Sequence, residues 1–301
     1  MQQPTTEKVT PVALTPRDLA MVLLVRDQPG SPQPVPTFTV PQLRRQAVQL
    51  AALAIPAVKV FASSTSRDPG RAPWNTPDDL MTQAITEIKT AAPGLTVITE
   101  NCLCSYTPTG ECYLPGPGGK PDLPATIAAL AEQATAHAGA GADIIGPAAM
   151  IPGAVRAARA ALDQAGHADT GIMPHLILDS RLYDPYRAAM GAVPASGDVR
   201  AFQGNPARPR DAINAGLAFV AEGAGTLLLE PALLTTDILI ALHAACGVPV
   251  APFSVSGEYT RFAPPDGRDW RLLTEVFTML KRAGAAQIIT YAADSLARTL
   301  S

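Results

Sequence analysis

The sequence predicts a TIM (β/α)8 barrel, and three observations support that fold. Eight short apolar runs alternate with helix-like segments along 301 residues. Most of these runs are apolar almost throughout, as is typical of parallel strands that helices cover. No Gly-rich phosphate loop follows the first run. A doubly wound open sheet is the alternative, and the missing loop disfavours it because the nucleotide-binding versions of that fold carry such a loop.

The elements follow one another in β/α order. The predicted strands are the apolar runs at 21–27, 57–63, 95–103, 142–150, 172–178, 226–233, 248–257 and 286–293. The predicted helices occupy 40–54, 76–92, 123–140, 153–166, 207–224, 235–246 and 268–285. Several begin at a Thr or Asp cap and end in Gly just before the next strand. No low-complexity linker divides the chain, so we expect an N-terminal arm at 1–15 and a single barrel domain at 16–301.

The composition excludes several classes of function. A net charge of −3 leaves no basic footprint for nucleic acid, so we expect a small-molecule partner. The N-terminal residues lack the basic start and apolar run of a signal peptide, and no later run approaches membrane-spanning length. We therefore expect a cytoplasmic protein with no membrane partner. Cysteines in that compartment stay reduced, which favours a metal ligand or a reactive thiol over a disulfide.

Three of the four cysteines fall within eleven residues. Cys102 and Cys104 close the third predicted strand with period-two spacing, and Cys112 returns from a loop that contains Pro and Gly. The carboxyl ends of TIM-barrel strands carry the active site. Three thiolates that converge there suit zinc and leave a fourth position for water or substrate. The alternative is that the thiols only pack as small hydrophobic groups, which is the expected role of Cys246.

Five stretches of sequence carry a family resemblance. They are VITENCLCSYTPTGEC, HAGAGADIIGPAAMIPGAVRAARAALDQAG, LYDPYRAAMGAVPASGDVRAFQGNP, VSGEYTRF and LKRAGAAQIITYAA. On these stretches the chain resembles porphobilinogen synthase, also called δ-aminolevulinate dehydratase, from about residue 15 to the C-terminus. The resemblance implies a TIM barrel that condenses two aminolevulinate molecules into a pyrrole. It also implies a homo-oligomer, usually an octamer held by N-terminal arms, although the arm is short here.

The sequence departs from this family at the two lysines of its active site. The resemblance places one lysine at Leu178, on the fifth strand, and the other at Glu230, where LLLEPAL replaces V-K-P-A-L. Neither side chain can form the imine with which the family polarises a ketone. Further departures are Glu100 in place of an aspartate, residues 109–112 in place of H-G-H-C, and three apolar residues in place of polar ones, Ala148, Ala149 and Pro152.

The carboxylate-binding parts of the family's site remain. The resemblance assigns one substrate carboxylate to Arg187, Arg200 and Gln203. It assigns the other to Ser256 and Tyr291. Guanidinium and hydroxyl groups suit carboxylates through bidentate and short hydrogen bonds. Taken alone, each has a structural alternative, such as an arginine in a surface ion pair or a serine that satisfies main-chain groups.

Two polar residues on predicted strands need a separate explanation. Lys59 interrupts AVKVF at the parity of Phe61, whose family counterpart borders the site. Lys59 either points into the barrel, where Glu230 is the obvious partner for a buried lysine, or extends outward between helices, and the sequence leaves these two orientations open. His175 has the opposite parity to Leu178, so we expect it in the core or facing a helix.

These observations predict a zinc enzyme that condenses, cyclises or dehydrates small carboxylate-bearing amino or keto acids in specialised metabolism, without a lysine imine. Glu230, Glu100 and Lys59 are its catalytic candidates, with Glu230 as a base or an ammonium-binding group. One alternative is a catalytically inactive paralogue that binds a small acid in a regulatory role. A weaker alternative is porphobilinogen synthesis through Lys59 or Lys120. The sequence leaves the substrates, the product and the oligomer size open.

Overall fold

The computed structural model is a closed barrel of parallel strands. It describes residues 12–28, 34–63, 67, 74, 76, 78–193 and 200–300, so most of the predicted arm lies outside the described residues. Neighbouring strands pair in parallel throughout. In chain order the barrel strands are β1 (Leu19–Arg26), β3 (Ala57–Ser63), β4 (Thr96–Asn101), β5 (Ile144–Pro147), β6 (Gly171–Ile172), β7 (His175–Ile177), β8 (Leu227–Glu230), β9 (Val250–Ser254) and β10 (Ile288–Thr290).

The barrel closes because β6 and β7 act as two halves of one strand. β6 pairs with β5, and β7 pairs with β8. Between them, Met173 N–H donates to Ile145 O (2.8 Å), and Pro174 O accepts from Leu228 N–H (3.0 Å). Pro174 has no N–H for a ladder, which is consistent with the break in the assigned strand. Counting β6 and β7 together gives eight strands, so the predicted barrel is confirmed.

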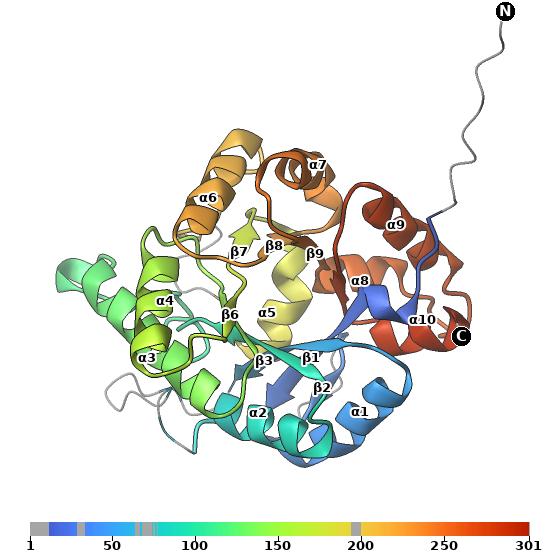
Figure 1. The fold of residues 1–301 in the computed structure, drawn as a ribbon, viewed down its shortest axis with the longest axis horizontal. Helices are drawn as coiled ribbons and strands as arrows, with labels where there is room; N and C mark the ends of the chain where they lie inside the picture. Colours follow the sequence, from blue (N-terminus) through green and yellow to red (C-terminus); the bar gives the residue numbers. More distant parts are fainter. Residues whose placement is uncertain are drawn as a thin grey trace, which may run out of the picture.

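Helices surround the strands. Figure 1 shows them as a ring around the central strands. Those predicted from sequence are α1 (Val40–Ala52), α2 (Leu80–Ala91), α3 (Leu123–Gly139), α4 (Ala154–Gln164), α6 (Pro209–Ala221), α7 (Thr236–Ala245) and α9 (Arg271–Arg282). The Asp79 and Asp122 side chains cap α2 and α3 by accepting main-chain N–H groups, as the sequence suggested.

Four short elements did not show in the sequence pattern. They are β2 (Thr37–Phe38), α5 (Asp184–Met190), α8 (Ser256–Phe262) and α10 (Ala293–Leu300). The last predicted residues of strand 248–257 belong instead to α8. There the Glu258 carboxylate accepts the N–H of Val255 (3.1 Å) and the N–H of Leu233 (2.9 Å), which starts the helix. Helices of seven or eight residues are too short to give a clear 3.6-residue period.

The core has two layers. One apolar cluster lies between the strands and the surrounding helices and includes Leu176 and Leu178. The other fills the barrel and includes Phe61, Cys102 and Ile177. The second cluster continues to the carboxyl ends of the strands, so it forms the floor beneath any site located there. Among the described residues, no helix combines the length and apolar character needed to cross a bilayer.

Gly257 in α8 packs closely against the short 3₁₀ helix at Arg181–Tyr183. A Cβ at this position would lie 2.5 Å from Leu182 O, closer than real contacts permit. We expect Gly257→Ala to lower the free energy of unfolding by about 1–3 kcal/mol, because main-chain atoms would have to move. The control is Gly139→Ala, whose Cβ would meet nothing within 4 Å. Denaturant unfolding of both variants tests this, and equal stabilities would contradict it.

Candidate active site

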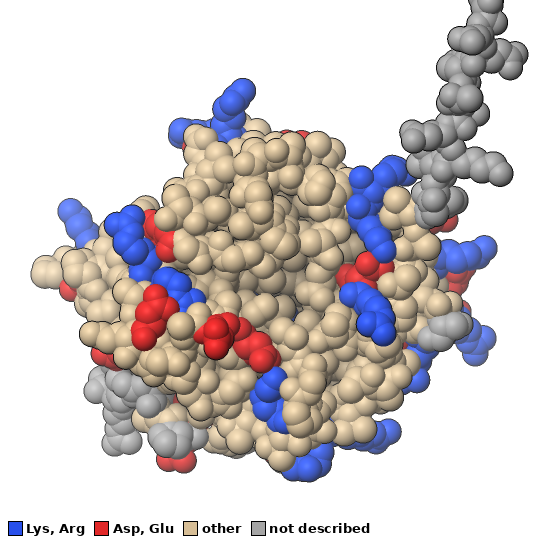
Figure 2. Space-filling view, in the orientation of Figure 1, with Lys and Arg blue, Asp and Glu red and all other residues tan. Residues whose placement is uncertain are grey.

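A cavity with about 530 Å³ of empty space lies at the carboxyl ends of the barrel strands. Eleven of the twelve site residues expected from the sequence line it, and Lys59 is the exception. They come from β3, β4, β8 and the segments that follow the strands. Figure 2 shows Lys, Arg, Asp and Glu around the rim of one face of the molecule and uncharged residues towards its centre. That face carries no continuous basic surface.

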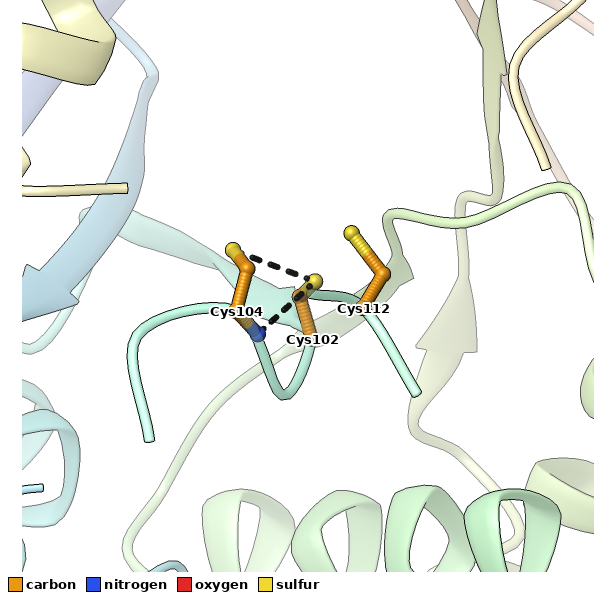
Figure 3. Close-up of side chains that lie close together, drawn as sticks. All are labelled: Cys102, Cys104 and Cys112. Carbon is orange, nitrogen blue, oxygen red and sulfur yellow. Dashed lines mark hydrogen bonds between the residues drawn. The ribbon is translucent and has the colours of Figure 1, made fainter. Parts of the chain in front are cut away.

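The three clustered cysteines converge at one edge of the cavity. Cys102 and Cys104 follow β4, and Cys112 lies on the returning loop; all three are buried. Figure 3 shows their side chains turned to the same side, with the sulfurs close together. The Sγ atoms of Cys102 and Cys104 are 3.4 Å apart, and all three sulfurs lie within 4.8 Å of one another. The loop between them is held in part by the hydrogen bond from Thr107 Oγ1 to Glu111 O (2.8 Å).

The charge around the thiols favours a thiolate. Hydrogen bonds from Cys102 and Cys104 hold the pKa of the Cys112 thiol well below its usual value, and the nearby Arg200 guanidinium adds to this effect. Arg200 Nη1 lies 3.8 Å from Cys112 Sγ. Conversely, hydrogen bonding to Cys104 and Cys112 raises the pKa of Cys102 well above its usual value. One negative charge is therefore favoured in the free cluster, and binding a cation would release the remaining thiol protons.

These thiols could hold a metal ion. A tetrahedral site with metal–sulfur bonds of about 2.3 Å spaces its sulfurs by about 3.8 Å, close to the spacing found here. Sulfur donors suit a soft or borderline cation rather than Mg²⁺ or Ca²⁺. The chain supplies three such donors, so a fourth position would face the cavity.

Glu230 ends β8 with its carboxylate in the barrel, where only 4% of the residue is exposed. Burial raises its pKa to about 8. Its Oε1 lies 2.8 Å from Nδ1 of His175, on the neighbouring strand β7. His175 is buried, as expected, but it faces the barrel interior rather than a helix and lines the cavity. Burial lowers the pKa of His175 well below its usual value, so the imidazole is neutral.

Lys59 points into the barrel and is fully buried. Its Nζ donates to Thr99 O on β4 (2.8 Å) and lies 5.4 Å from the Phe61 ring centre. Burial lowers its pKa to about 7, while the charges of Glu100 and Glu230 oppose that shift. Of the two alternatives for Lys59, the inward orientation is confirmed. Its direct partner is Thr99 O rather than the expected Glu230, which instead pairs with His175 among the described residues.

The fifth-strand position that faces the cavity is Ile177 rather than Leu178. Ile177 lines the cavity and stands beside Glu230 in the β7–β8 register. Leu178 belongs to the outer apolar cluster and forms a bridge with Gly204. Side chains alternate along a strand, so His175 and Ile177 share the inner face and Leu178 faces outward. The expected pairing of Leu178 with Glu230 in the site was thus one residue out of register, and the residue actually there is also unable to form an imine.

Two of the carboxylate-binding candidates already have partners within the protein. Arg187 pairs with Asp184 (3.2 Å) and lies near Asp179 (3.9 Å). Ser256 Oγ donates to Leu182 O (3.1 Å) and accepts from the N–H of Tyr186 (3.0 Å), which is the structural role noted as its alternative. Ser256 therefore helps to hold the cavity wall together.

Several polar atoms that line the cavity have no hydrogen-bond partner among the described residues. They are Tyr291 Oη, Gln203 Oε1, Arg200 Nε, Arg187 Nη2, His175 Nε2 and Tyr183 Oη. Buried polar groups are nearly always satisfied, and leaving one unpaired costs about 1–3 kcal/mol. Such atoms gathered around one cavity indicate that a polar ligand or water completes their hydrogen bonds.

Sequence reasoning found Phe61 and Tyr291 but missed two other aromatic residues of the wall, Tyr186 and Phe253. Tyr186 donates from its hydroxyl to both oxygens of Glu100 (3.3 and 3.4 Å), and its ring meets that of Phe61 edge-on at 5.4 Å. Phe253 stacks on Phe61 at 5.9 Å and lies 6.0 Å from Tyr291. Burial raises the pKa of Glu100 well above its usual value. The parity of Phe253 along its strand was the available signal, since Phe253 and Val255 both line the cavity.

Comparison with known proteins places this site in a family. A model of the family "Delta-aminolevulinic acid dehydratase" matches residues 2–299. The protein of that name from Halalkalibacterium halodurans is 34% identical over 296 residues, which cover 94% of this chain and 90% of the relative. The one from Escherichia coli is 36% identical over 261 residues, which cover 85% and 80%.

A solved structure agrees with the sequence comparisons. The delta-aminolevulinic acid dehydratase of Toxoplasma gondii ME49, in complex with the reaction product porphobilinogen, superposes with a TM-score of 0.91 at 28% identity. The match covers 97% of this chain and 87% of that structure. On the extent of these matches, this chain belongs to the delta-aminolevulinic acid dehydratase family.

Proposed function

We propose that the protein is a zinc-dependent enzyme of this family that joins, cyclises or dehydrates small carboxylate-bearing amino or keto acids without a lysine imine. The observation that carries the proposal is the side-by-side placement of Ile177 and Glu230, with no lysine among the residues that line the cavity. An imine needs an uncharged amine that reaches the substrate carbonyl. The lining offers acid–base groups instead.

Zinc is the metal that the cysteine cluster suits best. Three thiolates and an open fourth position are the pattern of a catalytic zinc site. When bound there, zinc would polarise a substrate carbonyl or hydroxyl as a Lewis acid. Arg200 would neutralise part of the cluster's negative charge, because its guanidinium lies next to Cys112.

The cavity suits substrates that carry carboxylates. Arg187 and Arg200 place two cations in the wall, and each has a guanidinium nitrogen without a hydrogen-bond partner among the described residues. Gln203 and Tyr291 add a free carbonyl oxygen and a free hydroxyl. Arginine forks bind carboxylates with two parallel hydrogen bonds. The name of the relatives supports this choice of substrate class, since it denotes a dehydratase of an amino acid.

Glu230 would supply the proton transfers. With a pKa of about 8 it can be either protonated or ionised near neutral pH, which suits a general acid or base. As a carboxylate it would take a proton from bound substrate, and as an acid it would protonate a departing hydroxyl. Tyr186 and Glu100 would order the opposite wall, and the aromatic rings would exclude water. A homo-oligomer and a cytoplasmic location are part of the proposal by analogy with the family.

A second candidate is porphobilinogen synthesis itself, and Lys59 is the reason to keep it. Its lowered pKa, about 7, would leave much of the amine uncharged and nucleophilic at neutral pH. However, Lys59 is fully buried and does not line the cavity, so the substrate could reach it only if the cavity floor opened.

Reductive trapping separates the two candidates. Incubation with aminolevulinate and borohydride should leave the intact mass of the chain unchanged, because the cavity offers no amine for imine formation. The Escherichia coli relative serves as the positive control. An adduct that appears in the wild type and disappears in Lys59→Met would favour the second candidate.

Binding and turnover then test the enzyme against an inactive paralogue. Small amino and keto acids that bind should raise the melting temperature, since a ligand at a hundred times its dissociation constant adds about 2.7 kcal/mol. Incubation of each binder with the zinc-loaded protein should consume it. Binders that are never consumed, with zinc in place, would instead support the regulatory paralogue.

A further inference from the structure

Lys59, His175 and Glu230 form a buried set of acid–base groups that crosses the floor of the cavity. They stand on three strands, β3, β7 and β8. The Glu230 carboxylate and His175 Nδ1 are 2.8 Å apart. His175 Nε2, on the other side of the ring, is buried and has no hydrogen-bond partner among the described residues. The imidazole thus has one nitrogen engaged with Glu230 and one nitrogen left over.

The free nitrogen of His175 and the amine of Lys59 border the same space. That space lies beside Gly146 on β5, where a Cβ would collide with Lys59 Nζ and come within 3.2 Å of His175 Nε2. Any residue larger than glycine would therefore force the amine to move from its present position. Gly146 has no positive φ, so the conformation of the backbone does not require glycine. A Cβ would also lie 2.6 Å from Thr99 O, so the glycine leaves room both for the neighbouring main chain and for the amine beside the imidazole nitrogen.

The charges of the set are finely balanced. Burial lowers the pKa of Lys59 to about 7 and raises that of Glu230 to about 8. A neutral acid with a neutral amine, and a carboxylate with an ammonium, therefore differ little in free energy. Both arrangements contain the same number of protons.

We propose that His175 couples Glu230 to Lys59 as a proton relay. In the first state, the protonated Glu230 donates to His175 Nδ1, and Nε2–H faces the neutral amine of Lys59. In the structure the amine donates to Thr99 O and not to Nε2, so the relay requires Nζ to turn to within hydrogen-bond distance of Nε2. The carboxyl proton then moves to Nδ1 while the Nε2 proton moves to Nζ. The second state has a Glu230 carboxylate, a neutral imidazole with the proton on Nδ1, and a Lys59 ammonium. No proton enters or leaves during the exchange, and His175 carries no net charge in either state.

The relay would let Glu230 change from acid to base without contact with solvent. In the second state the carboxylate takes a proton from substrate, and in the first state the carboxylic acid gives one up. A condensation that ends in loss of water needs both steps. This use rests on the function proposed above, whereas the coupling of the three residues does not.

Other titratable groups face the set from neighbouring elements, and most are neutral. Burial raises the pKa of Glu258 to about 7 and lowers that of His137 to about 3. The pKa values of the nearby tyrosines are raised well above their usual range. Glu100 interacts with the Lys59 charge more strongly than Glu230 does, but only Glu230 is joined to the His175 imidazole by a hydrogen bond. The groups concerned are Glu100, Cys102, His137, Tyr183, Glu258 and Tyr291.

Nitrogen NMR of labelled histidine tests the relay directly, because the chain has only four histidines. The zinc-loaded protein is studied in solution or, if the assembly is large, in the solid state. In the wild type, we expect His175 to show averaged or mixed Nδ1–H and Nε2–H tautomers. In Lys59→Met, which has no amine to receive the proton, we expect the Nε2–H tautomer alone.

Two further variants make the result specific. Gly146→Ala keeps the amine but occupies the space between it and Nε2, so it should fix the tautomer as Lys59→Met does. Lys89→Met is the matched control: this lysine pairs with Asp143 on the outside of the barrel and should leave His175 unchanged.

Identical His175 tautomers in the wild type, Lys59→Met and Gly146→Ala would overturn the relay. A static ion pair between Lys59 and Glu230 would also overturn the relay. Such a pair would appear as a single Nδ1–H tautomer of His175 in the wild type, with Lys59 charged throughout. Neither measurement needs a substrate. A protein that turns over no acid yet shows the tautomer response would contradict the proposed function and leave the relay intact.

Discussion

Cys104→Ala is expected to reduce bound zinc from close to one ion per chain to almost none. The change removes one of three thiol ligands and leaves a cavity-facing site with two. Two thiolates cannot enclose a tetrahedral ion without further protein ligands, and none of the other described His, Cys, Asp or Glu side chains joins the cluster. Metal analysis of the purified variant measures the loss. The three cysteines line the cavity, so a bound zinc ion would face the substrate, and turnover should fall with zinc content.

Cys246→Ala is the matched control for this prediction. Cys246 is the fourth buried cysteine, and its Sγ lies 3.2 Å from Val248 O, away from the cluster. Its replacement should keep zinc at the wild-type level and cost only packing energy. Zinc that stays bound in Cys104→Ala, or that is absent from the wild type, would contradict the proposed metal site.

The cysteine site was predictable because its signal is local. Two thiols at a strand end and a third on a short returning loop can meet in few ways, so spacing alone brought them together. The barrel was predictable for a related reason, since eight apolar runs in β/α order leave few arrangements. The split of the fifth strand at Pro174 was less visible, because the break depends on which main-chain groups find partners across the barrel.

The sequence did not reveal that His175 points into the barrel, because the direction of its side chain depended on the register of a short strand. The parity rule itself was correct: His175 and Ile177 share one face, and Leu178 takes the other. The error lay in choosing Leu178 as the inner residue. A three-residue strand gives no periodicity with which to correct such a choice. For Lys59, the parity of Phe61 two residues later suggested the inner face but left an outward orientation open, and the structure decides for the interior.

Glu230→Gln is expected to lower turnover of the true substrate by roughly a hundredfold or more. Glutamine keeps the shape of the side chain but can neither take nor give a proton. Its amide can still form the hydrogen bond with Nδ1 of His175, as donor or as acceptor, so the cavity and the zinc content should be retained. Steady-state kinetics and metal analysis of the same preparation measure the two effects separately.

The variant should be at least as stable as the wild type, and its advantage should grow as the pH rises from about 4.5 to about 8. Burial raises the pKa of Glu230 from 4.5 to about 8, so the folded protein holds a proton that the unfolded chain loses at lower pH. The stability that this carboxyl contributes is therefore present at low pH and is lost as the pH rises through about 8. Glutamine removes that dependence. Loss of turnover in Glu230→Gln thus cannot be attributed to unfolding.

Glu258→Gln provides the contrasting variant. Glu258 is also a buried carboxyl with a raised pKa, but its oxygens accept N–H groups from Val255 and Leu233 and it does not line the cavity. We expect that variant to lose stability while each folded chain keeps its turnover. If Glu230→Gln instead turns over substrate at the wild-type rate, Glu230 has no part in proton transfer, and the buried set of Lys59, His175 and Glu230 serves only to balance charge beneath the cavity.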